Sequence, residues 1–218
     1  FIQDAKNEGG FYAYNMDNDP LVENFVSATD ATKKVALAVG MSVQVKGKKV
    51  TYNGTYEIEK PSVKILKEEA TAVTPVDYTE AYIEAAKAGQ KGLEDKSLVG
   101  KQAMLVKLRG VEITKQGDNG YYKFKLAGME SYVRISSSAC PLSKDDQAKF
   151  KKLHTDNFGY TADVEGLVTV YNNAFYLTPV TANAFTNLAL PVREPADQIA
   201  FEKEVLEVPE SFDEDGSH

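Results

Sequence analysis

The sequence contains no tryptophan, one cysteine and two histidines in 218 residues. A single cysteine, Cys140, cannot form an intrachain disulfide, so a disulfide-built secreted scaffold is excluded. The chain also has no apolar run of about 18 residues or more, so no membrane-spanning helix is predicted. Without tryptophan, a surface on which sugar rings stack would have to be built from the 12 tyrosines.

No set of residues resembles a catalytic site, and we expect no enzyme activity, no cofactor and no metal site. Asp4, in the segment FIQDA, is the residue most similar to an active-site acid. Beside a turn, we expect its carboxylate to accept from backbone amides instead. Cys140 precedes a proline in the segment SSSACPLS, and we expect a small, half-buried residue rather than a nucleophile.

The formal net charge of −7 is unevenly distributed. Acidic side chains are in excess in residues 67–97 and above all in residues 183–218, whereas residues 98–182 carry a small excess of basic ones. The overall charge therefore does not exclude an anionic ligand on the 98–182 segment. Its positive field is nevertheless weak for a nucleic-acid-binding protein.

Two segments of the chain, 39–58 and 158–177, repeat each other without a gap. Such self-similarity predicts one structural unit that is used twice. In each copy a β-rich run ends in a turn signal, Asn53-Gly54 in the first and Asn172-Asn173 in the second. We expect Tyr52 and Tyr171, which precede these turns, to pack structurally. The pairs that carry the repeat are Gly40 with Gly159, Val45 with Val164, Gly47 with Gly166, Tyr52 with Tyr171, and Asn53 with Asn172.

The second copy lies in a segment that alternates between apolar and polar residues, which is typical of strands. Met104, Val106 and Leu108 share one face of the first predicted strand. Later strands place Tyr122, Phe124, Val133 and Ile135 inward. A helix is predicted over 143–154, with Ser143 as its cap. The predicted order is three strands, a helix and two strands.

That order resembles the OB-fold, a five-stranded barrel with a helix between its third and fourth strands. More narrowly, the chain resembles OB-type modules of multidomain secreted and surface proteins of bacteria. The resemblance is carried by FIQDA (1–5) with FYAYN (11–15), and by the two V-x-G-x-x-x-x-Y-N segments that end at Asn53 and Asn172. It implies a mainly β protein with short helices and two OB-like barrels, the first without an evident first strand.

We therefore predict an OB-like module over residues 1–66, a linker with a short helix over 67–97, and a second OB-like module over 98–182. Thr79 and Gly89 are the expected cap and stop of the linker helix, and a short helix is also expected within 17–38. The acidic tail, 183–218, is either the first strand of an Ig-like domain or a disordered end.

One strand face of the second module is a candidate binding site, because OB-folds bind ligands across their second and third strands. Aromatic rings for stacking and cations for phosphates suit single-stranded nucleic acid. An ordinary solvated strand face remains the alternative, since such residues are common cross-strand partners. The candidate residues are Tyr121, Lys123, Lys125, Tyr132 and Arg134, with Lys107 and Arg109 beside them.

The sequence therefore predicts a non-catalytic binding or spacer region of a larger extracellular or cell-surface protein of a bacterium. The alternatives are a nucleic-acid-binding accessory region of a secreted nuclease and a carbohydrate-binding module. The ligand is unknown, with single-stranded nucleic acid, a glycan or a protein as candidates, and we expect a monomer.

Overall fold

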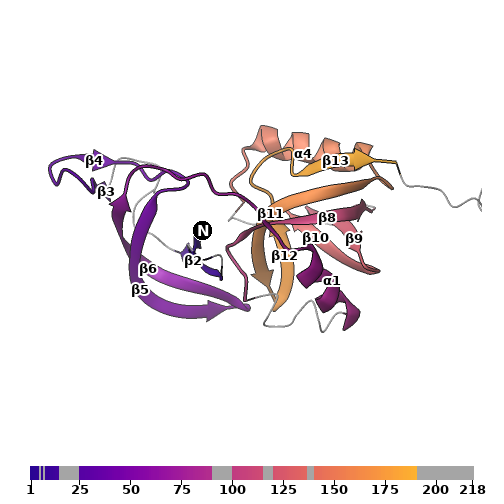
Figure 1. Cartoon of the computed structure of the whole chain (residues 1–218), viewed down its shortest axis with the longest axis horizontal. Helices are drawn as coiled ribbons and strands as arrows, with labels where there is room; N and C mark the ends of the chain where they lie inside the picture. Colours follow the sequence, from indigo (N-terminus) through magenta and orange to yellow (C-terminus); the bar gives the residue numbers. More distant parts are fainter. Residues whose placement is uncertain are drawn as a thin grey trace, which may run out of the picture.

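The structure is a computed structural model that describes residues 1–4, 6, 8–14, 25–89, 100–114, 120–136 and 140–190. The fold is mainly β, as predicted, and consists of a closed five-stranded barrel beside an open, strongly curved sheet (Figure 1). The predicted acidic tail lies outside the described residues beyond residue 190.

The barrel is formed by the second half of the chain. Its hydrogen-bonded order is β8-β9-β10-β12-β11, and β11 pairs again with β8 to close it. The only parallel pair among these five is β10 with β12, where Val133 lies opposite Leu177. The strands are β8 (Leu105–Ile113), β9 (Tyr121–Leu126), β10 (Met129–Arg134), β11 (Thr161–Tyr171) and β12 (Ala174–Thr178). Two further strands, β7 (Val76–Asp77) and β13 (Phe185–Ala189), extend the sheet beside β8 and β11.

The barrel core follows from the alternation in the sequence. Met104, Val106 and Leu108 are fully buried, as predicted, and Lys107 and Arg109 point to the other face. Tyr122, Phe124 and Val133 are buried in the same cluster, with Ile135 at its margin. Since strand residues alternate between the two faces, the outer face of β9 and β10 carries the predicted candidate residues.

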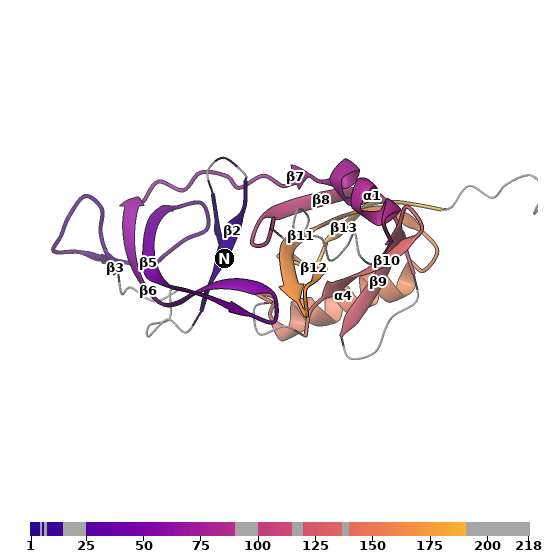
Figure 2. The same ribbon diagram turned by 90° about the horizontal axis from the view of Figure 1, so that it is seen from below.

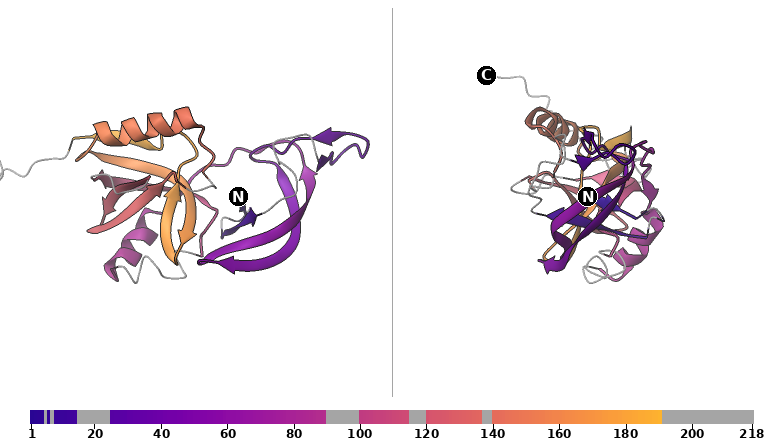
Figure 3. Two further views of the ribbon diagram at one scale, coloured as in Figure 1. Left: turned by 180° about the vertical axis from the view of Figure 1, so that it is seen from behind. Right: turned by 90° about the vertical axis from the view of Figure 1, so that its left-hand side faces the viewer.

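Two helices lie on opposite sides of the barrel (Figures 1 and 3). The helix α4 (Lys144–Asp156) begins as predicted, because the Ser143 hydroxyl accepts from the Asp146 backbone N–H at 3.1 Å. The helix α1 (Thr79–Lys87) is the predicted linker helix, and Gly89 follows it with φ +66°. Thr79 is not its cap, however, since its N–H and hydroxyl both donate to Asp77 Oδ1.

The linker helix is part of the barrel rather than a separate spacer. Tyr82 and Ala86 of α1 belong to the hydrophobic core, where the Tyr82 ring lies 6.2 Å from the Phe124 ring and 5.7 Å from the Phe175 ring. The preceding strand, β7, pairs in parallel with β8 (Figure 2). Residues 76–87 therefore contribute directly to the stability of the barrel.

The first half of the chain forms a four-stranded sheet in the order β1-β2-β6-β5. These strands are β1 (Ile2–Gln3), β2 (Gly10–Tyr14), β5 (Ser42–Tyr52) and β6 (Thr55–Lys67), and the turn between β5 and β6 is Asn53-Gly54, as predicted. The same order and the same parallel pair, β2 with β6, occur in the barrel as β9-β10-β12-β11. The described residues supply no strand corresponding to β8 and do not form the second barrel that was predicted.

The predicted short helix within 17–38 is not seen in the part of that segment that the structure describes. Residues 25–35 instead form a small hairpin of β3 (Phe25–Val26) and β4 (Lys34–Val35). Ser27 organises the turn, since its Oγ accepts from the backbone amides of Thr29 and Asp30. Short side-chain-to-backbone bonds of this kind compete with helix formation. Residues 17–24 lie outside the described residues.

Hydrogen bonds from three side chains connect the open sheet to the barrel. The Gln102 amide accepts from the Tyr56 backbone N–H at 2.8 Å and donates to the carbonyl oxygen of the same residue. Thr55 Oγ1 donates to the Val170 carbonyl at 2.6 Å, and Leu105 N–H donates to Gln3 Oε1 at 2.9 Å. The tip of the β5–β6 hairpin therefore lies beside the β11–β12 hairpin (Figures 1 and 3).

Candidate ligand-binding site

The outer face of β9, β10 and β12 carries a cluster of three tyrosine rings, Tyr121, Tyr132 and Tyr176. Their centroids lie 5.6 to 5.9 Å apart in each pair. Such spacing is typical of favourable edge-to-face and offset ring contacts. Two of these tyrosines were predicted as site residues; Tyr176 was missed because its strand joins β10 through a parallel, long-range pairing.

Arg134 lies at one end of this cluster and completes it. Its guanidinium carbon is 4.4 Å from the Tyr171 ring centroid and 5.4 Å from that of Tyr121, so the cation is held by two ring faces. Nε of Arg134 is buried without a hydrogen-bond partner, and the guanidinium forms no ion pair with any residue that the structure describes. We call Tyr121, Tyr132, Tyr171, Tyr176 and Arg134 the tyrosine–arginine cluster.

The lysines predicted for the site behave differently from Arg134. Lys123 lies over the Tyr132 ring at 5.8 Å and also pairs with Glu130 at 3.0 Å. Lys125 is exposed and lies two residues farther along β9, opposite Glu130 in the sheet register. The structure thus brings Tyr121, Lys123, Tyr132 and Arg134 together and leaves Lys125 at the margin.

The two cations considered beside the site are neutralised by acids. Lys107 Nζ lies 2.6 Å from Glu165 Oε1, and Arg109 Nε lies 2.6 Å from Asp77 Oδ2. The hydrogen bond from Arg109, with those from Thr79, lowers the pKa of Asp77 to about 2. Arg134, in contrast, contacts the tyrosine rings directly and forms no ion pair with a described residue.

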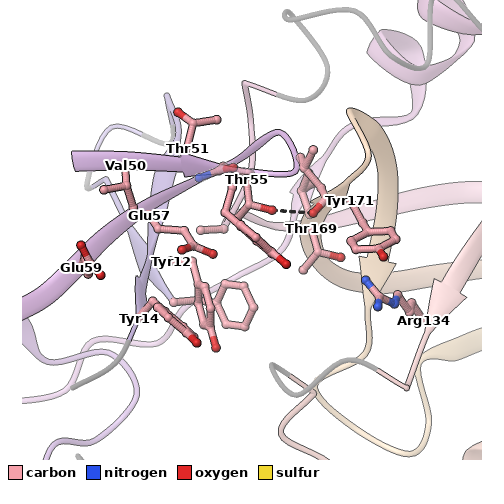
Figure 4. A pocket seen from close by; sticks show the side chains of 16 residues that line it. Tyr12, Tyr14, Val50, Thr51, Thr55, Glu57, Glu59, Arg134, Thr169 and Tyr171 are labelled. Carbon is pink, nitrogen blue, oxygen red and sulfur yellow. Dashed lines mark hydrogen bonds between the residues drawn. The ribbon is translucent and has the colours of Figure 1, made fainter. Parts of the chain in front are cut away.

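A cavity of about 570 Å³ lies between the tyrosine–arginine cluster and the open sheet (Figure 4). This volume falls within the range of about 300–1,000 Å³ that is typical of small-ligand pockets. Arg134, Thr169 and Tyr171 border it from the barrel, and side chains of β2, β5 and β6 border it from the sheet. Its principal aromatic and polar walls are Phe1, Tyr12, Tyr14, Tyr52, Glu57, Glu59, Gln102, Thr169, Tyr171 and Arg134.

The sequence did not predict this cavity. Alternation along FYAYN puts Tyr12 and Tyr14 on one face, but it does not say which strand lies beside them. Tyr52 and Tyr171 were expected to pack structurally, and this is wrong for Tyr52, which is 65% exposed at the cavity. Tyr171 does pack, but its partner is Arg134, the guanidinium of which lies over the Tyr171 ring.

The histidine, the cysteine and the aspartate considered as catalytic candidates lie away from the cavity lining or make local structural contacts. His154 is fully buried in the barrel core, with its Nε2 at 2.8 Å from the Lys123 carbonyl oxygen. Cys140 is half-buried, which raises the pKa of its thiol. Asp4 Oδ1 accepts from the Lys6 backbone N–H at 3.2 Å, as predicted for a turn. Within the described ranges, no three His, Cys, Asp or Glu side chains gather as a metal site would require.

Among the residues with described positions, no helix combines the length and apolar character needed to cross a membrane. No family model matches the chain, and no curated protein or solved structure matches it either. The cavity and the tyrosine–arginine cluster are therefore the features from which a function can be inferred.

Proposed function

We propose that this chain is a non-catalytic binding region of a larger extracellular or cell-surface bacterial protein, built from two OB-like modules. In this proposal the second module is a complete barrel and the first is the same module without its first strand. The ligand lies across the tyrosine–arginine cluster and extends into the adjoining cavity.

The main support for this proposal is that the Arg134 guanidinium contacts two tyrosine rings and has no ion-pair partner among the described residues. A guanidinium held between two tyrosine rings has a fixed orientation, and nothing among the described residues neutralises it. Arginine presents a planar fork of donors, which matches carboxylate, phosphate or neighbouring hydroxyl oxygens. Three adjacent tyrosine rings then supply a surface for flat or ring-shaped groups.

A binding role suits this site better than a spacer role. A spacer needs contacts between its modules, and Gln102 and Thr55 provide them. It does not need a cavity with aromatic walls and an uncompensated cation. The burial of His154 in the core supports the non-catalytic part of the proposal, because that imidazole cannot reach a bound molecule.

The pairing of Lys107, Arg109 and Lys123 with acids weakens the case for nucleic acid as the ligand. Strong nucleic-acid binders neutralise several phosphates with unpaired cations. A glycan needs fewer charges and uses rings and hydrogen-bonding side chains, which the cluster and the cavity offer. We therefore place a glycan ahead of single-stranded nucleic acid.

The test is a titration of two probes by fluorescence anisotropy, a labelled thymidine dodecamer and a labelled neutral hexasaccharide, at low and at moderate salt. Binding to either probe should weaken about tenfold or more in Arg134→Gln, the scale of one lost charge-assisted contact. Tyr132→Ala should weaken it as well. Lys151→Gln removes an exposed cation on α4 and serves as the matched control.

The salt dependence separates the two ligand classes. Binding of the dodecamer that falls steeply with salt identifies a nucleic-acid site, whereas salt-insensitive binding of the hexasaccharide identifies a glycan site. Binding that is equally strong in Arg134→Gln, or no binding of either probe at low salt, would overturn the proposed site.

A further inference from the structure

Two tyrosine–glutamate pairs lie side by side on the wall of the cavity that belongs to the open sheet. In the parallel pairing of β2 with β6, Tyr12 lies opposite Glu57 and Tyr14 lies opposite Glu59. Residues two apart in a strand share a face, so all four side chains project from the same side of the sheet. Figure 4 shows them at the cavity, and all four line it.

Neither carboxylate forms an ion pair with a residue that the structure describes. Glu57 is only 7% exposed, and its carboxylate has neither a hydrogen bond nor an ion pair with any described residue. Lys48 lies opposite Glu59 in the register, yet it is exposed and forms no ion pair with it. The Phe1 amino group, at the same cavity, forms none with either acid.

Two carboxylates side by side repel each other, and the partial burial of Glu57 adds to the cost of its charge. Burial and the neighbouring Glu59 charge both raise the pKa of Glu57. The amide of Gln102, which also lines the cavity, already bonds with both backbone groups of Tyr56. Among the described residues of this wall no cation pairs with the two acids, and Arg134 lies on the opposite wall.

The aromatic side chains here favour the same kind of group. The Tyr12 ring lies 5.2 Å from the Phe1 ring and 6.1 Å from the Tyr14 ring, so three rings lie together in the cavity that the two acids line. Ring faces attract cations, and aromatic cages are used to recognise organic ammonium groups. A phosphate backbone would be repelled by the two glutamates, and a neutral sugar would leave their charge unbalanced.

We propose that the cavity between the open sheet and the barrel binds the ammonium group of an organic cation, with Glu57 and Glu59 as counter-ions and the rings of Tyr12 and Tyr14 as its cage. This deepens the proposed function and rests on it in one respect, because the ligand extends from this subsite toward the tyrosine–arginine cluster. At that end Arg134 selects an anionic or hydroxyl-bearing group.

The subsite is tested with choline and with its uncharged analogue, in which a carbon replaces the ammonium nitrogen. These two probes have nearly the same shape and differ in charge. In an NMR titration of the whole chain, choline should shift the backbone amides of Tyr12, Tyr14 and Glu57 in a saturable way. The analogue should leave them in place.

Variants assign the effect to the carboxylates and rings. Glu57→Gln and Glu59→Gln should each weaken choline binding about tenfold, as loss of a charge-assisted contact does, and Glu112→Gln, an exposed strand glutamate of the barrel, should not. Tyr12→Leu should abolish binding, and Tyr12→Phe should retain it because the ring remains. A thermal unfolding curve for each variant shows whether it is folded.

Arg134→Gln separates this inference from the proposed function. It should leave choline binding intact, since its guanidinium lies on the opposite wall. Choline binding to both the unmodified chain and Arg134→Gln would support the ammonium subsite, even if the cluster bound neither the dodecamer nor the hexasaccharide. Equal binding of choline and the uncharged analogue, or no binding of choline, would overturn the ammonium subsite whatever the cluster binds.

Discussion

The backbone N–H of Asn173 donates to the carbonyl oxygen of Asn53 across 3.3 Å, so the turns of the two repeated hairpins touch each other. Both asparagines have positive φ, as their turns require. The repeat in the sequence thus marks two equivalent hairpins and also the place where the two halves of the molecule meet.

Gly54→Ala should disturb this junction. Gly54 has φ +84°, and an added Cβ would lie 2.6 Å from Asn173 Oδ1 and 2.9 Å from its backbone nitrogen. We expect a loss of about 2 kcal/mol or more in the free energy of unfolding, of which about 1–2 kcal/mol is the cost of the left-handed conformation. Denaturant unfolding of the variant and of the unmodified chain measures this loss.

Gly128→Ala is the matched control, because Gly128 has φ +82° and nothing within 4 Å of the position of a Cβ. It should show only the conformational cost. Equal losses for Gly54→Ala and Gly128→Ala would mean that the contact between the hairpins contributes nothing.

Gln102→Ala should loosen the open sheet. Gln102 is 2% exposed, and its amide satisfies both backbone groups of Tyr56. Leaving them unpaired costs about 1–3 kcal/mol. We expect lower stability and faster hydrogen exchange in β6, while the barrel strands stay protected. Exchange measured by mass spectrometry checks this, and unchanged protection of β6 would contradict it.

Stability should fall as the pH decreases below about 6.5, because burial lowers the pKa of His154 in the folded state. Above the ordinary histidine pKa of about 6.5 both states are neutral. Below it only the unfolded state takes up the proton, so unfolding is favoured by up to ~1.4 kcal/mol per pH unit. Urea unfolding between pH 7 and pH 5 measures the slope.

His154→Gln keeps a polar group near the Lys123 carbonyl and removes the titration. It should therefore reduce this pH dependence, whatever its effect on stability at neutral pH. A slope as steep as that of the unmodified chain would show that another group is responsible.

Asp77→Asn should have a small effect at neutral pH, because the Asp77–Arg109 pair is largely exposed and solvent screens such pairs. The pKa of Asp77 is lowered to about 2, so its contribution is present above about pH 4 and disappears as the pH falls toward 2. Acid unfolding of the two proteins should converge there; a constant difference down to pH 2 would contradict it.

Local chemistry in the sequence predicted several elements. Asn53-Gly54 marks a hairpin because the pair adopts positive φ readily, and Ser143 begins a helix through a bond three residues away. Alternation placed Val106, Leu108 and Phe124 in the core. Each of these features depends on residues that are near one another in the chain.

The cavity could not be predicted in this way. It needs the parallel register that sets Tyr12 beside Glu57, and the contact that brings Tyr171 and Arg134 to face them. Both join residues far apart in the chain, and neither leaves a periodic pattern. The ion pairs of Lys107 and Arg109, which change the charge of the site, are likewise set by neighbouring strands and turns.

Among the described residues, the open sheet has one buried apolar side chain, Ile65, and the β3–β4 hairpin adds Phe25, whereas the barrel has a continuous core. Parts of a protein with few such contacts open at lower free energy. We therefore expect the sheet to open at a lower free energy than the barrel. A ligand bound between the sheet and the barrel would raise the free energy of opening of the sheet, because it contacts both units.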